Sequence, residues 1–198
     1  QNRELARLVK QRTEELVSTR MQVIRRLGLA AEYKDNETGM HIVRMSHITR
    51  LLAVAYGGNE DWVETLFNAA PMHDIGKIGI PDHVLLKPGK LDDKEWNTMQ
   101  GHAVIGAKII GNDPSELIQM SYLIALNHHE KWDGSGYPRG LKGEEIPLEG
   151  RIVALADVFD ALTSERPYKK AWGVEQAFNY IEQQAGRHFD PELVDIFL

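Results

Sequence analysis

The sequence places an adjacent histidine and aspartate inside an apolar stretch, FNAAPMHDIGKIGIPD at residues 67–82. A carboxylate in such surroundings is costly to desolvate unless it meets a cation or hydrogen-bond donors. Imidazole and carboxylate together suit first-row divalent metals, and Lys77 follows Asp74 closely enough to face the same cavity. The stretch therefore predicts a metal site, with an internal Asp74–Lys77 ion pair as the simpler alternative.

Other histidines and acids lie in apolar surroundings elsewhere in the chain. They are His102 within MQGHAVIGAKII (99–110), His128 and His129 after an apolar helical stretch, and Asp157 within RIVALADVFDAL (151–162). A buried acid needs a partner, although a lone histidine in such a setting is often a hydrogen-bonded core residue. Together these side chains favour a two- or three-metal site built from facing helices.

Two further positions could belong to this site. Glu37 and His41 are four residues apart, so on a helix both point from one face and could reach one ion. A solvated charged pair is the alternative. Asp160 follows Asp157 by three residues and competes with it as a ligand. The remaining histidines lack this setting and are expected at the surface or in local hydrogen bonds: His47, His83 and His188.

The apolar residues recur mostly at helical spacing, which predicts an all-α fold. Candidate helices span residues 41–56, 59–75, 92–110, 114–127, 152–163, 174–185 and 191–198. Asp92, Asp113 and Asp190 are predicted to cap three of them, the last two directly before a proline. Residues 130–150 contain five glycines and two prolines, which predicts an irregular segment of a kind that is often functional.

Residues 1–33 predict one long helix, because they contain no proline and no glycine before Gly28. Apolar residues at positions 5, 9, 16 and 23, with Arg12 and Thr19 between them, follow a seven-residue repeat. The repeat favours a connector helix that pairs in a homodimer, and packing on the chain's own domain is the alternative. We therefore expect a connector at residues 1–32 and a globular domain at residues 33–198.

Composition excludes several classes of protein. The 198 residues include no cysteine, which rules out disulfides, thiolate metal sites and thiol catalysis. No apolar run approaches the roughly 18 residues of a membrane span, and the polar N-terminal residues are unlike a signal peptide. A cytoplasmic location without membrane contact is therefore expected. A net charge of −6 speaks against binding to a nucleic-acid polymer.

Basic and aromatic residues gather near the predicted metal ligands. Arg166, Lys169 and Lys170 follow the helix of Asp157, and Tyr137 lies in the glycine-rich segment. An aromatic ring can stack on a base while cations hold the phosphates, which is what a nucleotide phosphodiester requires. A solvated basic face is the alternative interpretation of the three cations.

Several long motifs, in this order, resemble those of the HD-GYP family of bacterial phosphodiesterases. They are ETGMH (37–41), HDIGKIGIPD (73–82), LLKPGKL (85–91), HHEKWDGSGYPRGLKG (128–143), IPLEGRIVALADVFDALTSERPYKKA (146–171) and FDPELVDIF (189–197). The resemblance covers residues 33–198. It implies a helical bundle of the HD-domain type with a Gly-Tyr-Pro loop, which hydrolyses cyclic di-GMP to linear pGpG and often onward to GMP. The first helix is similar to the connector after receiver domains in response regulators of this family, which implies two-component signalling.

The resemblance also implies roles for individual residues. The resemblance implies two catalytic residues. Asp74 is the ligand that bridges two ions, and Lys77 places its positive charge beside a phosphate. Substrate contacts match Tyr137, Arg166 and Lys169. The matching metal ligands are Glu37, His41, His73, Asp74, His102, His128, His129 and Asp157, which would hold two or three divalent ions, iron or manganese. The pair Glu37 and His41 matches the additional ligands of three-metal members.

Other functions remain open at this point. An HD-type phosphohydrolase that acts on another nucleotide would share the ligands, but the glycine-rich Tyr137 segment counts against it. A catalytically silent sensor of cyclic di-GMP, or a module that binds a diguanylate cyclase (GGDEF) protein, has no need to keep eight ligands. Metal content separates these classes, because a protein that only binds should often purify without stoichiometric metal and lose nothing on chelation.

Overall fold

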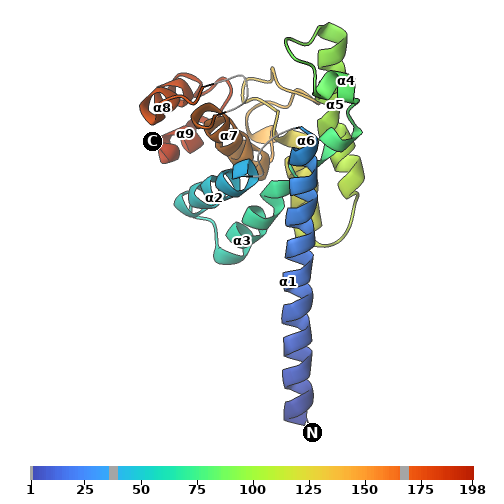
Figure 1. Ribbon diagram of the computed structural model, residues 1–198. Helices are drawn as coiled ribbons and strands as arrows, with labels where there is room; N and C mark the ends of the chain where they lie inside the picture. Colours follow the sequence, from blue (N-terminus) through green and yellow to red (C-terminus); the bar gives the residue numbers. More distant parts are fainter. Residues whose placement is uncertain (1, 36–39, 166–169) are drawn as a thin grey trace.

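The chain folds into α-helices joined by loops and short 3-10 turns (Figure 1). The computed structural model describes residues 2–35, 40–165 and 170–198. Within these ranges no strand forms, and the one β-type pairing is an isolated bridge between Ala185 and Phe189. The predicted all-α class is therefore confirmed.

The elements follow one another along the chain with short connections, apart from the glycine-rich segment. The α-helices are α1 (Asn2–Lys34), α2 (Met40–Ala55), α3 (Glu60–Ala69), α4 (Asp82–Leu85), α5 (Asp93–Ile110), α6 (Glu116–Asn127), α7 (Leu148–Thr163), α8 (Val174–Gln183) and α9 (Pro191–Phe197). The 3-10 helices are η1 (Ala70–Met72), η2 (Ile75–Gly79) and η3 (Gly143–Glu145).

Helix ends differ from the predicted ones where proline or close packing decides them. α3 ends before residue 75 because Pro71 opens the separate turn η1, and the sequence pattern did not predict η2 or the short α4. α7 begins before residue 152 and includes Gly150. A Cβ at Gly150 would lie 3.0 Å from Cβ of Asn127 on α6, so glycine allows the two helices to meet.

Two of the three predicted caps are confirmed. Asp92 forms a capping box with Glu95 at the start of α5, and the Asp190 side chain caps α9. The prediction for Asp113 is wrong, because α6 begins later. Asp113 instead accepts a hydrogen bond from the backbone N–H of Ser115 in the turn before the helix.

The main core forms where α2, α3, α6, α7, α8 and α9 meet, and its fully buried members include Leu66, Ile124, Ile152 and Leu193. α6 contacts α3 and α7 as well as α5, so it joins this core to the part of the bundle that holds α4 and α5 (Figure 1). η2 packs on α5 and η1 packs on α2, α3 and α6. The apolar stretch with its histidine and aspartate therefore lies at the junction of the two parts.

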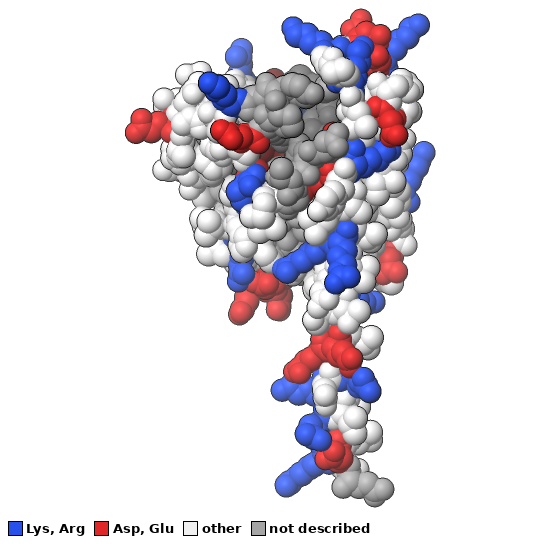
Figure 2. Space-filling view, in the orientation of Figure 1, with Lys and Arg blue, Asp and Glu red and all other residues white. Residues whose placement is uncertain are grey.

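α1 is a single helix of which only the last third packs on the domain. Its buried residues are Ile24, Gly28, Ala31 and Glu32, and residues 2–20 are exposed. The N-terminal part extends away from the body as a rod that carries both acidic and basic side chains (Figures 1 and 2). The division into a connector at 1–32 and a domain at 33–198 stays a prediction. No helix in the described ranges is long and apolar enough to span a membrane.

Candidate metal centre

The predicted ligands that the structure describes gather into two sets. Within each set, the donor atoms all lie within 4.8 Å of one another. The first set consists of Asp74, His102, His128 and His129, and the second consists of His41, His73 and Asp157. At ordinary bond lengths of about 2.0–2.2 Å, ligands on opposite sides of one ion lie about 4 Å apart. Each set is therefore compact enough to hold an ion.

These ligands come from elements that are distant in sequence. His41 lies at the start of α2, His73 and Asp74 between η1 and η2, His102 in α5, His128 and His129 at the C-terminal end of α6, and Asp157 in α7. Core packing of α6 against α5 and α7, and of α2 against α7, brings these segments together.

Main-chain carbonyls orient three buried imidazoles so that Nε2 faces the site. Nδ1 of His73, His102 and His128 lies 3.0, 2.7 and 3.1 Å from a carbonyl oxygen three or four residues earlier. Such bonds fix the ring and its tautomer, as in known metal sites. All three Nε2 atoms are buried and make no hydrogen bond with the described residues. Buried polar atoms without partners are costly, so a metal ion fits this arrangement.

Asp74 belongs to the first set and also faces the second. Its Oδ1 is 3.3 Å from Nε2 of His102 and 3.4 Å from Nε2 of His128, and it also makes no hydrogen bond with the described residues. Its Oδ2 is 3.3 Å from Nε2 of His73, which belongs to the second set. One carboxylate thus faces donors of both sets, the arrangement that a ligand shared by two ions requires.

The ion pair considered as the simpler alternative is also present. Lys77 Nζ lies 2.8 Å from Oδ2 of Asp74 and 2.6 Å from Oδ2 of Asp35 at the end of α1. Burial raises the pKa of Asp74, but the charges of Lys77 and His73 outweigh it and hold the pKa well below its usual value. The carboxylate is therefore ionised at neutral pH, as a metal ligand must be.

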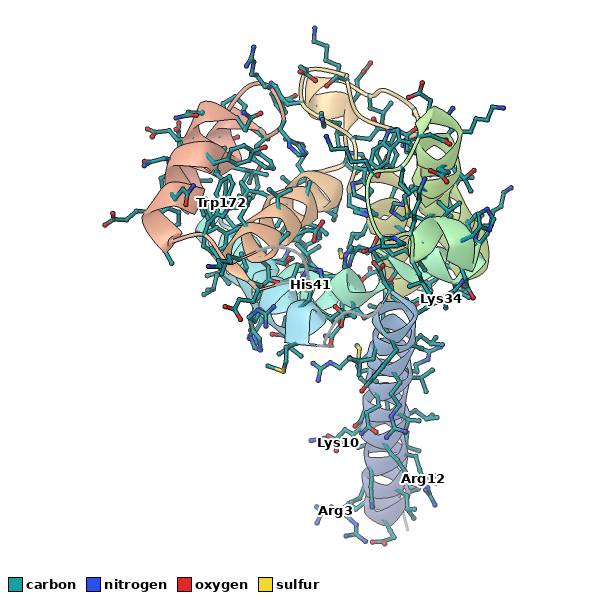
Figure 3. The ribbon with its side chains drawn as sticks, turned by 45° about the horizontal axis from the view of Figure 1, so that its top comes forward. Arg3, Lys10, Arg12, Lys34, His41 and Trp172 are labelled. Carbon is teal, nitrogen blue, oxygen red and sulfur yellow. The ribbon has the colours of Figure 1, made fainter. Side chains whose placement is uncertain are left out.

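Asp160 supports His41 and does not compete with Asp157. Oδ2 of Asp160 lies 2.7 Å from Nδ1 of His41, whose Nε2 lies 3.3 Å from Oδ1 of Asp157. Arg44 holds the Asp160 carboxylate through two bonds, at 2.6 and 3.0 Å. This chain of contacts fixes the His41 ring, which Figure 3 places in the middle of the bundle.

The Gly-Tyr-Pro loop packs directly on the first set. The Tyr137 ring stacks on His129, with centroids 4.7 Å apart, and the Tyr137–Pro138 peptide bond is cis. Gly136 permits this approach, because a Cβ there would lie 2.5 Å from the carbonyl oxygen of His129. The buried Glu130 carboxylate accepts hydrogen bonds from the backbone N–H groups of residues 139 and 141 and so holds the loop.

An exposed aromatic side chain lies at the edge of this loop. The Trp96 ring on α5 meets Tyr137 edge-on, with centroids 6.1 Å apart, and is 46% exposed. Burial raises the pKa of Tyr137 above its usual value, so its hydroxyl stays protonated at neutral pH. Burial, followed by the neighbouring His128, lowers the pKa of His129 well below its usual value, which favours the neutral ring that binds metals.

Some predicted site residues lie outside the described residues: Glu37, Arg166 and Lys169. The structure groups His41 with His73 and Asp157, and its assignment with Glu37 to a further ion stays a prediction. Sequence reasoning missed Asp35 and Trp96. Both lie in polar sequence surroundings, where no apolar neighbours marked them.

Known proteins are similar to this chain over most of its length. A family model described as HD domain matches residues 5–193. The chain is 52% identical over 177 residues to a cyclic di-GMP phosphodiesterase response regulator of Xanthomonas campestris, covering 89% of this chain and 47% of that protein. It is 46% identical over 184 residues to 3'3'-cGAMP-specific phosphodiesterase 2 of Vibrio cholerae, covering 93% of this chain and 35% of that protein. The chain thus spans half or less of the curated relatives' length.

Solved structures agree with the fold. A cyclic GMP-AMP specific phosphodiesterase of Vibrio cholerae superposes with a TM-score of 0.66 at 21% identity, covering 89% of this chain and 47% of that one. An HD-GYP-type protein of Bdellovibrio bacteriovorus superposes with a TM-score of 0.62 at 19% identity, covering 79% and 50%. The family match covers nearly the whole chain and leads to one conclusion: the chain belongs to the HD domain family.

Proposed function

We propose that this chain hydrolyses cyclic di-GMP to linear pGpG in a metal-dependent reaction. The observation that carries the proposal is the set of buried donor atoms without hydrogen-bond partners among the described residues: Nε2 of His73, His102 and His128 and Oδ1 of Asp74. Relatives that are named cyclic di-GMP phosphodiesterases add support, at 52% and 48% identity. The protein class is a hydrolase of phosphodiesters.

The two ligand sets are the proposed places of two divalent ions, iron or manganese. Such ions would neutralise charge on the phosphoryl oxygens and lower the pKa of a water molecule. Nitrogen and oxygen donors suit both metals. A third ion held by Glu37 with His41 stays a prediction, since Glu37 lies outside the described residues.

Lys77 is the proposed phosphate contact of the protein itself. Its ammonium has three N–H donors, of which two face Asp74 and Asp35. We propose that the third donates to a phosphoryl oxygen of the substrate. Burial lowers the pKa of Lys77, but the charges of Asp74 and Asp35 raise it above its usual value, so the group stays charged.

Aromatic side chains are proposed to position the substrate. Tyr137 stacks on His129 and presents a protonated hydroxyl beside the ligands, and Trp96 offers an exposed ring 6.1 Å away on which a guanine base could stack. Arg166 and Lys169 are further proposed contacts to the phosphates.

The mixed cyclic dinucleotide 3'3'-cGAMP is a second candidate substrate. Relatives that carry this specificity in their names are 46% and 38% identical to this chain. The ligand sets would serve either substrate, because both present the same phosphodiester. Base contacts must decide between them.

We further propose that α1 mediates a homodimer. Leu5, Val9, Leu16 and Val23 are between 50% and 65% exposed along one stripe of the helix. The stripe continues into a groove of about 780 Å³ between α1 and the domain, lined by apolar residues such as Leu27, Ile78 and Ile109. α1 of a second copy is the proposed occupant. Sedimentation equilibrium of wild-type protein and of Leu16→Glu tests it: a dimer that the substitution dissociates supports the proposal, and a wild-type monomer opposes it.

Contacts with GGDEF proteins, a role in a two-component system and a cytoplasmic location stay predictions. A pull-down with a purified GGDEF domain would test the first of these. Failure to retain that domain would leave the enzyme proposal intact.

The deciding experiment is anaerobic turnover by the chain loaded with Fe²⁺ or Mn²⁺, with products separated by chromatography. Cyclic di-GMP and 3'3'-cGAMP are tested in parallel. Asp74→Asn should abolish turnover, whereas Asp195→Asn, an exposed aspartate on α9, should behave as the wild type. The substrate with the higher kcat/KM identifies the specificity.

Two outcomes oppose the proposal. Full activity of Asp74→Asn would remove Asp74 from the site. A metal-loaded wild-type chain that binds cyclic di-GMP tightly without turnover would favour the sensor function instead.

A further inference from the structure

We propose that the last turns of α1 position the His73–Asp74 pair, and that Lys34 is a positioning residue for metal binding. The inference rests on the proposed function and deepens it, because it names a segment outside the ligand sets on which their geometry depends. The end of α1 contacts the segments on both sides of the His73–Asp74 pair.

The first contact lies just before the pair. Gly28 on α1 packs against η1 so closely that a Cβ would lie 2.5 Å from the carbonyl oxygen of Pro71. η1 ends at Met72, directly before His73, and the contact is backbone to backbone. Any sideways shift of α1 at Gly28 must therefore move η1 or open a gap beneath it.

The second contact lies just after the pair. Nζ of Lys34 lies 2.7 Å from the carbonyl oxygens of Ile78 and Ile80 and 3.4 Å from that of Lys77. Lys77 and Ile78 lie in the last turn of η2 and Ile80 follows it directly; the Lys77 carbonyl also accepts a backbone hydrogen bond from Ile80. An ammonium with three N–H donors suits three carbonyl oxygens. Figure 3 shows Lys34 at the domain end of α1, beside the green segment that contains η2.

Two residues beside Lys34, namely Asp35 and Glu32, also contact segments that carry proposed ligands. Asp35, directly after α1, lies 2.6 Å from the ammonium of Lys77, so Lys34 and Asp35 together bind both the backbone and the side chain at position 77. Glu32 Oε1 accepts a hydrogen bond of 2.9 Å from the backbone N–H of Ile42, next to His41. The end of α1 thus contacts segments that supply ligands to both sets.

η2 has little freedom to move away from Lys34. On its other side Gly76 touches α5, where a Cβ would lie 1.8 Å from the carbonyl oxygen of His102. η2 is therefore held between Lys34 and α5. Loss of the Lys34 contacts should loosen the η2 side and allow Asp74 to move relative to the histidines.

The test compares Lys34→Met with Lys10→Met in the full chain. Lys10 lies on the projecting part of α1, with a side chain 78% exposed and a surface ion pair to Glu14 (Figure 3). We expect Lys34→Met to lower Mn²⁺ affinity about 10-fold in titration calorimetry, the effect typical of residues that support metal ligands. We also expect kcat for cyclic di-GMP to fall by a similar factor with KM unchanged. Lys10→Met should match the wild type, and Lys34→Arg should restore most of the affinity.

Equal Mn²⁺ affinity of Lys34→Met and Lys10→Met would overturn the inference. If Lys34→Met fails to fold, the Mn²⁺ affinity of Lys34→Gln is compared with that of the wild type instead. The glutamine amide keeps one or two of the N–H donors, so we expect an affinity below that of the wild type but less reduced than a loss of about 10-fold. Faster amide hydrogen exchange confined to residues 75–80 would support a positioning role, whereas faster exchange throughout the bundle would oppose it. A wild-type chain that binds Mn²⁺ but hydrolyses no cyclic dinucleotide would refute the proposed function while leaving the affinity comparison valid.

Discussion

Replacing Gly76 by alanine should separate two metal ligands by a predictable amount. The new Cβ would lie 1.8 Å from the carbonyl oxygen of His102 and 2.4 Å from the backbone nitrogen of Gly106. Real Cβ atoms essentially never approach a neighbour closer than 3.0 Å, so η2 and α5 must move apart by at least about 1.2 Å. Metal–ligand distances tolerate roughly ±0.2 Å. Asp74 Oδ1 and His102 Nε2, now 3.3 Å apart, would then lie up to about 4.5 Å apart, beyond the roughly 4.4 Å that two bonds of about 2.2 Å can span.

Stability and metal binding should both fall in Gly76→Ala. Overpacking of this kind costs about 1–3 kcal/mol, and we expect that loss in the free energy of unfolding measured with urea. Mn²⁺ affinity in titration calorimetry should fall at least 10-fold, as an order-of-magnitude estimate. Gly101→Ala is the matched control on α5, because its Cβ would lie 3.9 Å from the nearest atom, the Cδ1 of Ile105. Gly76→Ala protein with wild-type Mn²⁺ affinity would refute the argument from close approach.

Three other substitutions test separate parts of the molecule. Asp160→Asn should lower Mn²⁺ affinity roughly 10- to 100-fold in calorimetry, because it weakens the bond that orients His41; an unchanged affinity would argue against that role. Trp96→Ala should raise KM for cyclic di-GMP by an amount equivalent to about 1–3 kcal/mol with kcat retained, and an unchanged KM would exclude base stacking there. Burial and then the charge of Lys131 lower the pKa of His188 to about 4 in the folded chain. Between pH 6.5 and 4, His188 is protonated in the unfolded chain but still neutral in the folded chain. Lowering the pH through this range should therefore lower the free energy of unfolding, by about 3 kcal/mol at most. Urea titrations should show a weaker fall in His188→Gln, and parallel curves would contradict the prediction.

Most of the proposed ligands could be picked out from sequence because they interrupt apolar stretches. His102 and Asp157 stand among residues that must be buried, and a buried polar group demands an explanation. Helical spacing gave the fold class for a similar reason, since an apolar stripe must face a core. These inferences depend only on what surrounds each residue along the chain.

Contacts that depend on meeting in space were not predictable in this way. Asp35 directly follows α1 in a polar stretch, and nothing near it in sequence indicates that it binds Lys77. Asp160 lies on the same helix as Asp157, so sequence spacing could not separate the acid that contacts Nδ1 of His41 from the proposed ligand. Packing of α2 against α7 makes that distinction, because it places Oδ2 of Asp160 at Nδ1 of His41.

The close approach at Gly28 also gives α1 the mechanics of a lever. At about 1.5 Å per residue, the helix extends about 39 Å from Gly28 to Asn2 and about 9 Å from Gly28 to Lys34. With Gly28 as the fulcrum, the two arms have a ratio of about four to one. A sideways displacement of about 4 Å at Asn2 therefore corresponds to about 1 Å at Lys34, a distance on the scale that decides whether a metal ligand reaches its ion.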